Sequence, residues 1–224
     1  MNSVKIIQTK DGSHSLLNEV LNETYHSTHG AIQESAYVFI KNGLDFCVNQ
    51  NKTQNINIFE VGFGTGLNAF LALKFATENK IKVNYHSIEA FPIDQQILDQ
   101  LNYSDLIPFS DGKNLFEEIH KSSWGENIKI SEFFSLTKIK QSIQEIILTE
   151  FFHLVFFDAF APAKQPEMWE LPVLKKVVGS LKPQGVFVTY CAKGQLKRDL
   201  KSLGLTVETL PGPPGKREMV RGRK

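Results

Sequence analysis

Residues 57–68 read NIFEVGFGTGLN, and this stretch decides the fold of the chain. The residues before the first glycine are mostly β-branched and aromatic, which predicts a strand over 57–62. Residues 67–77 then carry apolar side chains at helical spacing, so the glycines lie in a turn between a strand and a helix. Glycine permits a sharp turn there and lets the backbone approach a ligand where a Cβ atom would collide.

A second strand and helix follow directly. Apolar residues alternate over 83–90, and this predicted strand ends on Glu89. Pro92 then suits the first turn of a helix over 93–101, and two such units in succession indicate a parallel sheet. Later in the chain, residues 153–158 read HLVFFD, a continuous apolar run that ends on a carboxylate. Such a run is typical of a strand buried on both faces at the centre of a sheet.

The rest of the chain completes an α/β fold with a mostly parallel, doubly wound, Rossmann-like sheet and a C-terminal antiparallel hairpin. Further strands are expected at 37–40, within 128–139, and at 186–190, 206–209 and 217–220, with helices at 141–148, 169–181 and 196–203. Residues 1–55 precede the first clear strand, and we expect them to pack on the core as an N-terminal extension. Residues 56–224 are expected to form a single globular domain.

Composition narrows the class of protein. With 224 residues, of which 42% are apolar and 22% charged, the chain suits one buried α/β core. Its two cysteines, Cys47 and Cys191, are too few for a disulfide framework, which indicates a reducing, cytoplasmic compartment. Residues 1–13 lack the apolar segment of a signal peptide, so neither export nor membrane insertion is expected.

The net charge of +1 hides a basic bias towards the C-terminus. The basic residues there are Lys193, Lys197, Arg198, Lys201, Lys216, Arg217, Arg221, Arg223 and Lys224. A polyanion can dock on such a surface without the whole protein being strongly basic. A solvated helix face followed by a soluble tail is the alternative explanation.

The spacing of the glycines distinguishes between classes of cofactor. The pattern is G-x-G-x-G from Gly62 to Gly66. The dinucleotide fingerprint G-x-G-x-x-G fails, because Leu67 lies three positions after Gly64. An acidic residue at the strand end, Glu60, can instead attract the cationic amino acid part of S-adenosyl-L-methionine. We therefore expect S-adenosyl-L-methionine as the cofactor.

Glu89 supports the same cofactor. It ends the strand expected beside the first, where a carboxylate can accept hydrogen bonds from both ribose hydroxyls. The residues expected to contact the cofactor are Glu60, Gly62, Phe63, Gly64, Thr65, Gly66, Asn68 and Glu89. No clear acidic partner for the adenine amino group is found between residues 128 and 142. The pattern predicts the class I fold of S-adenosylmethionine-dependent methyltransferases.

Three longer motifs resemble one family. GFGTGLN at 62–68, DAFAPAKQPEMW at 158–169 and PGKREM at 214–219 resemble the methyltransferase part of the MnmC family, and residues 11–39 resemble its leader. That family makes 5-methylaminomethyl-2-thiouridine in tRNA. Its two-part members carry an additional flavin-dependent oxidase. Because the sequence ends at Lys224, the chain is similar to the stand-alone form, sometimes called MnmD.

The resemblance implies a reaction and its partners. The stand-alone form methylates the amine of 5-aminomethyl-(2-thio)uridine at the wobble position of tRNA, so tRNA is the expected substrate. Separate enzymes would then install the aminomethyl group.

Asp158 is the expected catalytic residue. It follows the central strand at the edge where α/β sheets bind ligands, and the motif DAFAP resembles a variant of the acidic motif of amino methyltransferases. A carboxylate there can orient the N–H bonds of the acceptor amine and relieve the positive charge that develops on nitrogen.

The same motifs supply the residues expected to bind the substrate. Phe160 and Trp169 are expected to stack on the uracil ring, and Pro162 to belong to the same loop. Lys164, Lys216 and Arg217 are expected to contact phosphates.

Other chemistries find no support in the sequence. The six histidines form no H-x-x-x-H pair and no cluster with cysteine, so no metal site is expected, and the hydrolase motif G-x-S-x-G is missing. Two alternatives stay open: a methyltransferase of another amine, and a non-catalytic RNA-binding protein with a methyltransferase fold. Heat of binding with S-adenosylmethionine would exclude the non-catalytic alternative.

Overall fold

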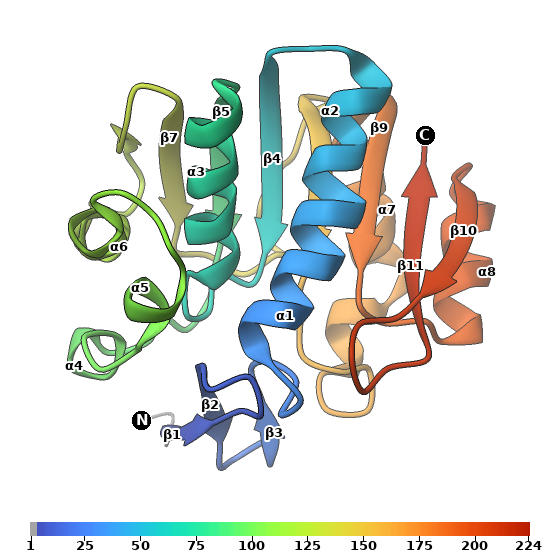
Figure 1. The fold of residues 1–224 in the computed structure, drawn as a ribbon. Helices are drawn as coiled ribbons and strands as arrows, with labels where there is room; N and C mark the ends of the chain where they lie inside the picture. Colours follow the sequence, from blue (N-terminus) through green and yellow to red (C-terminus); the bar gives the residue numbers. More distant parts are fainter. Residues whose placement is uncertain (1–3) are drawn as a thin grey trace.

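The computed structural model describes residues 4–224, in which helices cover both faces of an eight-stranded sheet and a small three-stranded sheet lies at one end (Figure 1). The large sheet contains β4 (Asn55–Val61), β5 (Lys82–Ile88), β6 (Asn127–Lys129), β7 (Phe134–Ile139), β8 (Phe152–Phe157), β9 (Leu181–Thr189), β10 (Thr206–Pro211) and β11 (Glu218–Arg223). The small sheet contains β1 (Val4–Gln8), β2 (His14–Asn18) and β3 (Glu23–Thr24).

The order of the strands confirms the Rossmann-like fold. It runs β10-β11-β9-β8-β4-β5-β7-β6, and the five strands from β9 to β7 are parallel. The hairpin β10–β11 joins this sheet antiparallel, as expected. From β4 the chain builds outwards through β5 and β7, and then returns to place β8 on the other side of β4. The carboxyl ends of β4 and β8 therefore flank the crevice in which α/β sheets bind ligands.

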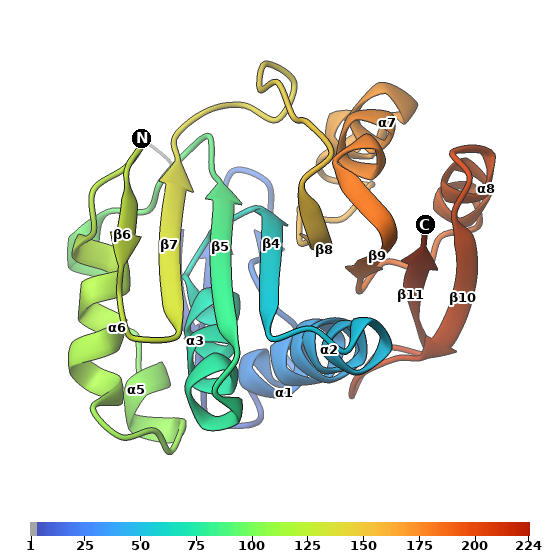
Figure 2. The same ribbon diagram turned by 90° about the horizontal axis from the view of Figure 1, so that it is seen from above.

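Two layers of helices enclose the sheet (Figure 2). On one face lie α1 (Ala31–Ser35), η1 (Ala36–Asp45), α2 (Phe46–Asn51), α3 (Leu67–Asn79) and α6 (Gly112–Lys121), and on the other lie α7 (Leu171–Gly179) and α8 (Gly194–Ser202). The short helices α4 (Gln95–Leu98), α5 (Tyr103–Leu106) and η2 (Pro166–Trp169) lie in the connections. Among residues 4–224, no helix has the length and apolar character needed to cross a membrane.

The predicted strand at residues 37–40 is wrong. These residues lie in the middle of the long helix formed by α1, η1 and α2, which has π-helical turns at its centre. The helix buries Val38, Phe39 and Leu44 against β8, β9 and α3. A short apolar run does not distinguish a strand from a buried stretch of helix.

The predicted helix at 141–148 is also wrong, because the segment is a loop. Only Ile143 is buried in it, and the Lys176 side chain donates hydrogen bonds to the carbonyls of Ile143 and Gln144. The helix predicted at 93–101 is only the short α4, which Asp94 caps, so Pro92 lies outside it. The other predicted elements lie at or near their expected positions. The domain boundary at residue 55 stays a prediction.

Gly43 lies where the long helix crosses the central sheet. A Cβ atom built on it would lie 2.9 Å from Cγ2 of Val188 and 3.1 Å from Cε1 of Phe156. Both neighbours belong to the buried core, where packing leaves little room for movement. The missing side chain therefore sets how closely the helix approaches the sheet.

We predict that Gly43→Ala lowers the free energy of unfolding. Overpacking costs about 1–3 kcal/mol and outweighs the gain in helix propensity, which is at most about 1 kcal/mol. Gly179→Ala is the matched control, since a Cβ atom at the end of α7 would have no neighbour within 4 Å. Urea denaturation should show the control to be at least as stable as the wild type. Equal stability of the two variants would mean that the helix moves away from the sheet at no cost.

Candidate active site

A cavity of about 920 Å³ lies at the carboxyl ends of the parallel strands, and residues of both the large sheet and the small N-terminal sheet line it. Its walls are the glycine loop, residues 88–91 and 141–144, the loop after β8, the segment around β3, and the side chains of Glu34, Tyr190 and Lys216. The Lys164 side chain connects the loop after β8 to the segment just before β3. Its Nζ donates to the carbonyls of Leu21 and Asn22, at 3.0 Å each.

The glycine loop requires glycine for two different reasons. At Gly62 the φ angle is +94°, and a Cβ atom would lie 2.7 Å from the carbonyl oxygen of Asp158. At Gly64 the φ angle is +49°, and a Cβ atom would lie 3.2 Å from Cδ1 of Tyr25. The first glycine lets β4 and β8 approach each other, and the second keeps the backbone open to the cavity.

Glu89 closes the loop from the neighbouring strand end. Its carboxylate accepts the N–H of Gly64 at 3.2 Å and the N–H of Phe91 at 2.9 Å. Burial raises the pKa of Glu89, while these hydrogen bonds lower it. Since Glu89 also lines the cavity, its carboxylate is within reach of a ligand's hydroxyl groups.

Asn68, in the first turn of α3, connects two acids. Its Nδ2 donates to Glu60 Oε1 at 3.1 Å and to Asp158 Oδ2 at 2.8 Å. The hydroxyl of Ser87 donates to the other oxygen of Glu60 at 2.6 Å. Asn68 is one of the residues that line the cavity, and its buried Oδ1 has no hydrogen-bond partner among residues 4–224.

Glu60 itself does not line the cavity. It is fully buried, and burial raises its pKa to about 8, with the nearby charge of Asp158 acting in the same direction. Its link to the cavity therefore runs through Asn68. Gly66 also lies outside the cavity wall, whereas Gly62, Phe63, Gly64, Thr65, Asn68 and Glu89 form part of it.

Asp158 faces the cavity directly after β8. Burial, together with repulsion by Glu34, raises its pKa to about 7. The hydrogen bond from Asn68 and the charge of Lys216 act in the opposite direction. This carboxyl therefore changes protonation state near neutral pH, the range in which an acid–base group is useful.

The predicted substrate residues do not all lie together. Phe160 lines the cavity and meets the ring of Tyr25 edge-on, with centroids 4.8 Å apart. Trp169 lies in the core, where it packs on Phe157 and donates from Nε1 to the carbonyl of Phe160. Pro162 and Arg217 do not line the cavity, and Arg217 is exposed.

Sequence reasoning missed Glu34 and Tyr190. Tyr190 had a usable signal, because it follows β9, a parallel strand that ends at the same edge as β8. Glu34 lies in a helix and carries no comparable signal. Among residues 4–224, no group of three or more His, Cys, Asp and Glu side chains could hold a metal ion.

Comparison with known proteins shows which proteins the chain is similar to. A family model described as S-adenosyl-L-methionine-dependent methyltransferase matches residues 115–224. A bifunctional MnmC protein of Leptospira borgpetersenii, named for tRNA 5-methylaminomethyl-2-thiouridine biosynthesis, is 30% identical over 92% of this chain and 33% of its own length. Through the family-model match the chain is similar to the S-adenosyl-L-methionine-dependent methyltransferases. Its cofactor is S-adenosyl-L-methionine.

Further relatives agree. The MnmC protein of Leptospira interrogans is 32% identical over 92% of this chain, and the chain spans only about a third of the length of these curated relatives. The crystal structure of MNMC2 from Aquifex aeolicus superimposes with a TM-score of 0.78 at 26% identity, covering 99% of this chain and 70% of that one. Spermidine synthase from Thermotoga maritima, at 12% identity and a TM-score of 0.57, shares the fold.

The cavity of this methyltransferase suits S-adenosylmethionine. The open backbone at Gly64 leaves room for a ligand, Glu89 can accept from ribose hydroxyls, and Asn68 lines the same cavity. We propose that these residues hold the cofactor.

We predict that Gly64→Val weakens S-adenosylmethionine binding more than about tenfold, a loss of about 1.4 kcal/mol. The branched side chain would meet Tyr25 and enter the cavity. Gly204→Val is the control, because Gly204 has a φ of +90° but a Cβ atom there would have no neighbour within 4 Å. Calorimetric titration of both variants, after circular dichroism has confirmed folding, separates the two effects. Unchanged affinity in Gly64→Val would remove the glycine loop from the cofactor site.

Proposed function

We propose that the chain transfers a methyl group from S-adenosylmethionine to the amine of 5-aminomethyl-(2-thio)uridine at the tRNA wobble position. The product is 5-methylaminomethyl-(2-thio)uridine. The observation that carries this proposal is Asp158, an acid fixed by Asn68 on the wall of the cavity where the cofactor is expected. The names of the MnmC relatives support the substrate. A cytoplasmic location, and supply of the aminomethyl group by separate enzymes, belong to the same proposal.

For this methyl transfer, the protein needs mainly to position the amine and to supply a charged group beside it. S-adenosylmethionine, when bound, supplies an electrophilic methyl group on a sulfonium. An aminomethyl group is protonated near neutral pH and must lose a proton before its nitrogen lone pair can form the new N–C bond. Asp158 accepts that proton or a hydrogen bond from the amine, and Asn68 keeps its carboxylate facing the cavity.

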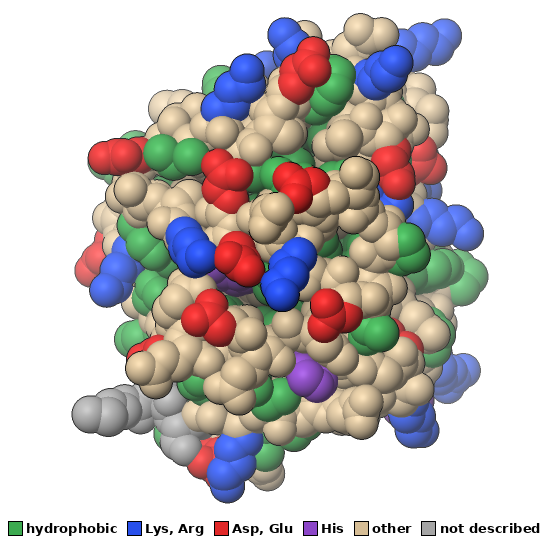
Figure 3. All heavy atoms as spheres, turned by 60° about the vertical axis from the view of Figure 1, so that its left-hand side comes forward, with side chains coloured by type: hydrophobic (Ala, Val, Ile, Leu, Met, Phe, Trp, Pro, Cys, Tyr) green, Lys and Arg blue, Asp and Glu red, His purple; other side chains and the backbone are tan. Residues whose placement is uncertain are grey.

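The loop that carries Lys216 and Arg217 is the proposed entry side for tRNA. The face shown in Figure 3 has acidic and basic side chains interspersed, which offers no continuous basic surface to an RNA backbone. Arg217 is exposed on the β10–β11 loop, beside the residue that enters the cavity. We therefore assign the phosphate contact to Arg217, while Lys216 has another partner inside the cavity.

A direct assay tests the function. Purified protein, S-adenosylmethionine and tRNA from cells that lack this methyltransferase should yield 5-methylaminomethyl-(2-thio)uridine, detected by nucleoside mass spectrometry. The control is tRNA whose wobble uridine carries no aminomethyl group, which should accept no methyl. Methylation of a different nucleoside or of a small amine would replace the proposed substrate. Absence of both cofactor binding and methyl transfer would favour the non-catalytic alternative.

We predict that Asp158→Asn lowers the single-turnover rate with saturating tRNA by about two to four orders of magnitude, because the charge facing the amine is lost. S-adenosylmethionine affinity should stay near the wild-type value. The wild-type rate should rise with pH through about 7, since the carboxyl acts when ionised and its raised pKa keeps it protonated below that value. The variant should lack this dependence. A rate within about threefold of the wild type would assign proton removal to solvent.

A further inference from the structure

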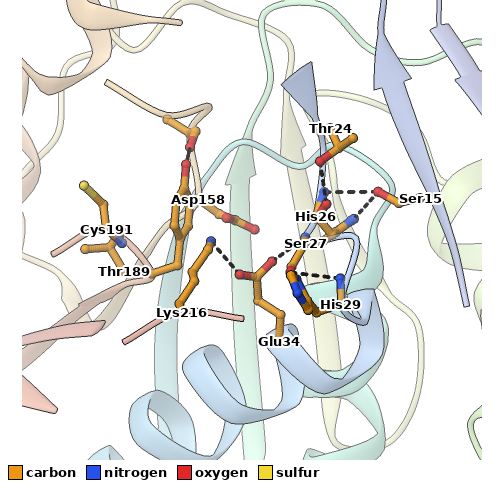
Figure 4. Close-up of polar contacts among 12 residues, drawn as sticks. Ser15, Thr24, His26, Ser27, His29, Glu34, Asp158, Thr189, Cys191 and Lys216 are labelled. Carbon is orange, nitrogen blue, oxygen red and sulfur yellow. Dashed lines mark hydrogen bonds and ion pairs between the residues drawn. The ribbon is translucent and has the colours of Figure 1, made fainter. Parts of the chain in front are cut away.

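The wall beside Asp158 contains a second buried acid. Glu34, at 5% exposure, reaches the cavity from α1, and its Oε2 accepts the N–H of Ser27 at 2.7 Å. Its Oε1 lies 2.6 Å from Nζ of Lys216. Figure 4 shows the ends of Asp158, Glu34 and Lys216 converging on one space.

An aromatic ring completes the surroundings of the lysine. Nζ of Lys216 lies 3.6 Å from the centroid of the Tyr190 ring, which places the ammonium on the π face. The ring is held in place, because the Tyr190 hydroxyl donates to the carbonyl of Ala159 at 2.8 Å and Trp169 packs against its edge. A fixed carboxylate and a fixed aromatic face together form a binding site for an alkylammonium ion.

The carboxyl groups on this wall attract a cation. Glu34 and Asp158 carry two carboxyl groups, and Lys216 is the cation that interacts with both. Lys164, the other lysine on the cavity wall, is committed to backbone carbonyls of the β2–β3 segment. An incoming ammonium group would therefore be attracted to this place, whereas a neutral acceptor would gain nothing from it.

Lys216 reaches the site from a surface loop. It lies on the exposed β10–β11 loop, its side chain is 30% exposed, and its flexible stem can turn towards solvent. Its ammonium is the same chemical group as a protonated aminomethyl substituent. The lysine thus occupies a position that suits the substrate's own cation.

We propose that Glu34 and the ring of Tyr190 bind the alkylammonium group of the acceptor, and that Lys216 is a tethered occupant that withdraws when the acceptor enters. This inference rests on the proposed function, since it names the part of the cavity that recognises the amine. Glu34 and Tyr190 then select a charged amine and hold it beside Asp158, where its proton is removed. Lys216 keeps the buried acid paired while the site holds no substrate.

The test uses n-propylammonium as the probe, measured by calorimetric titration of the full chain. Lys216→Met should bind the probe about tenfold more tightly than the wild type, because the competing cation is gone. Adding Glu34→Gln should abolish that gain, as should adding Tyr190→Leu, whereas adding Tyr190→Phe should keep it. Lys193→Met, which removes an exposed positive charge outside the cavity wall, is the matched control and should behave as the wild type.

Two outcomes overturn the proposal: equal binding of the probe by Lys216→Met and the wild type, or tight binding that persists in Lys216→Met/Glu34→Gln. Lys216→Gln replaces Lys216→Met if the latter does not fold. In the tRNA assay, Glu34→Gln in the wild-type background should raise KM more than it lowers kcat. Because the probe needs no tRNA, binding without tRNA methylation would refute the proposed function and leave an ammonium site for another amine.

Discussion

One side-chain amide holds together the two strand ends between which the cavity opens. Asn68 donates from a single nitrogen to Glu60, in β4, and to Asp158, after β8. Without it, the buried carboxyl group of Glu60 and the half-buried one of Asp158 would face each other with no donor between them, and both already have raised pKa values. The amide therefore makes it possible to keep a reactive acid on the cavity wall at the centre of the sheet.

The arrangement around this amide draws on the whole chain. The glycine loop and Asn68 precede the part matched by the family model, residues 115–224, whereas Asp158, Tyr190 and Lys216 lie within it. Glu34 comes from the first helix and meets Lys216 from the last loop. The matched part alone would have the acid and the lysine, but neither the loop that approaches the cofactor nor the second acid.

The sequence was sufficient to predict the site residues that lie at the ends of parallel strands. Glu89 and Asp158 were predicted because their carboxylates end strands, and such ends meet at one edge. The ion pair of Lys216 with Glu34 was not predicted, since a basic residue in a loop carries no information about an acid in a distant helix. The helix across residues 37–40 was not predicted, because its apolar run fits a strand as well as a helix. Glu60 was expected to face the ligand, but the direction of a buried side chain depends on its partners, Asn68 and Ser87.

The contact between Glu34 and Lys216 has a consequence for how the protein is made. It joins residues near opposite ends of the chain, so closing it costs more loop entropy than closing the local strand–helix units. During synthesis the parallel sheet can begin to form around β4 and β5 long before the β10–β11 loop emerges from the ribosome. The amine-facing wall is then completed last, and a nascent chain that already has its glycine loop would not yet discriminate between acceptors.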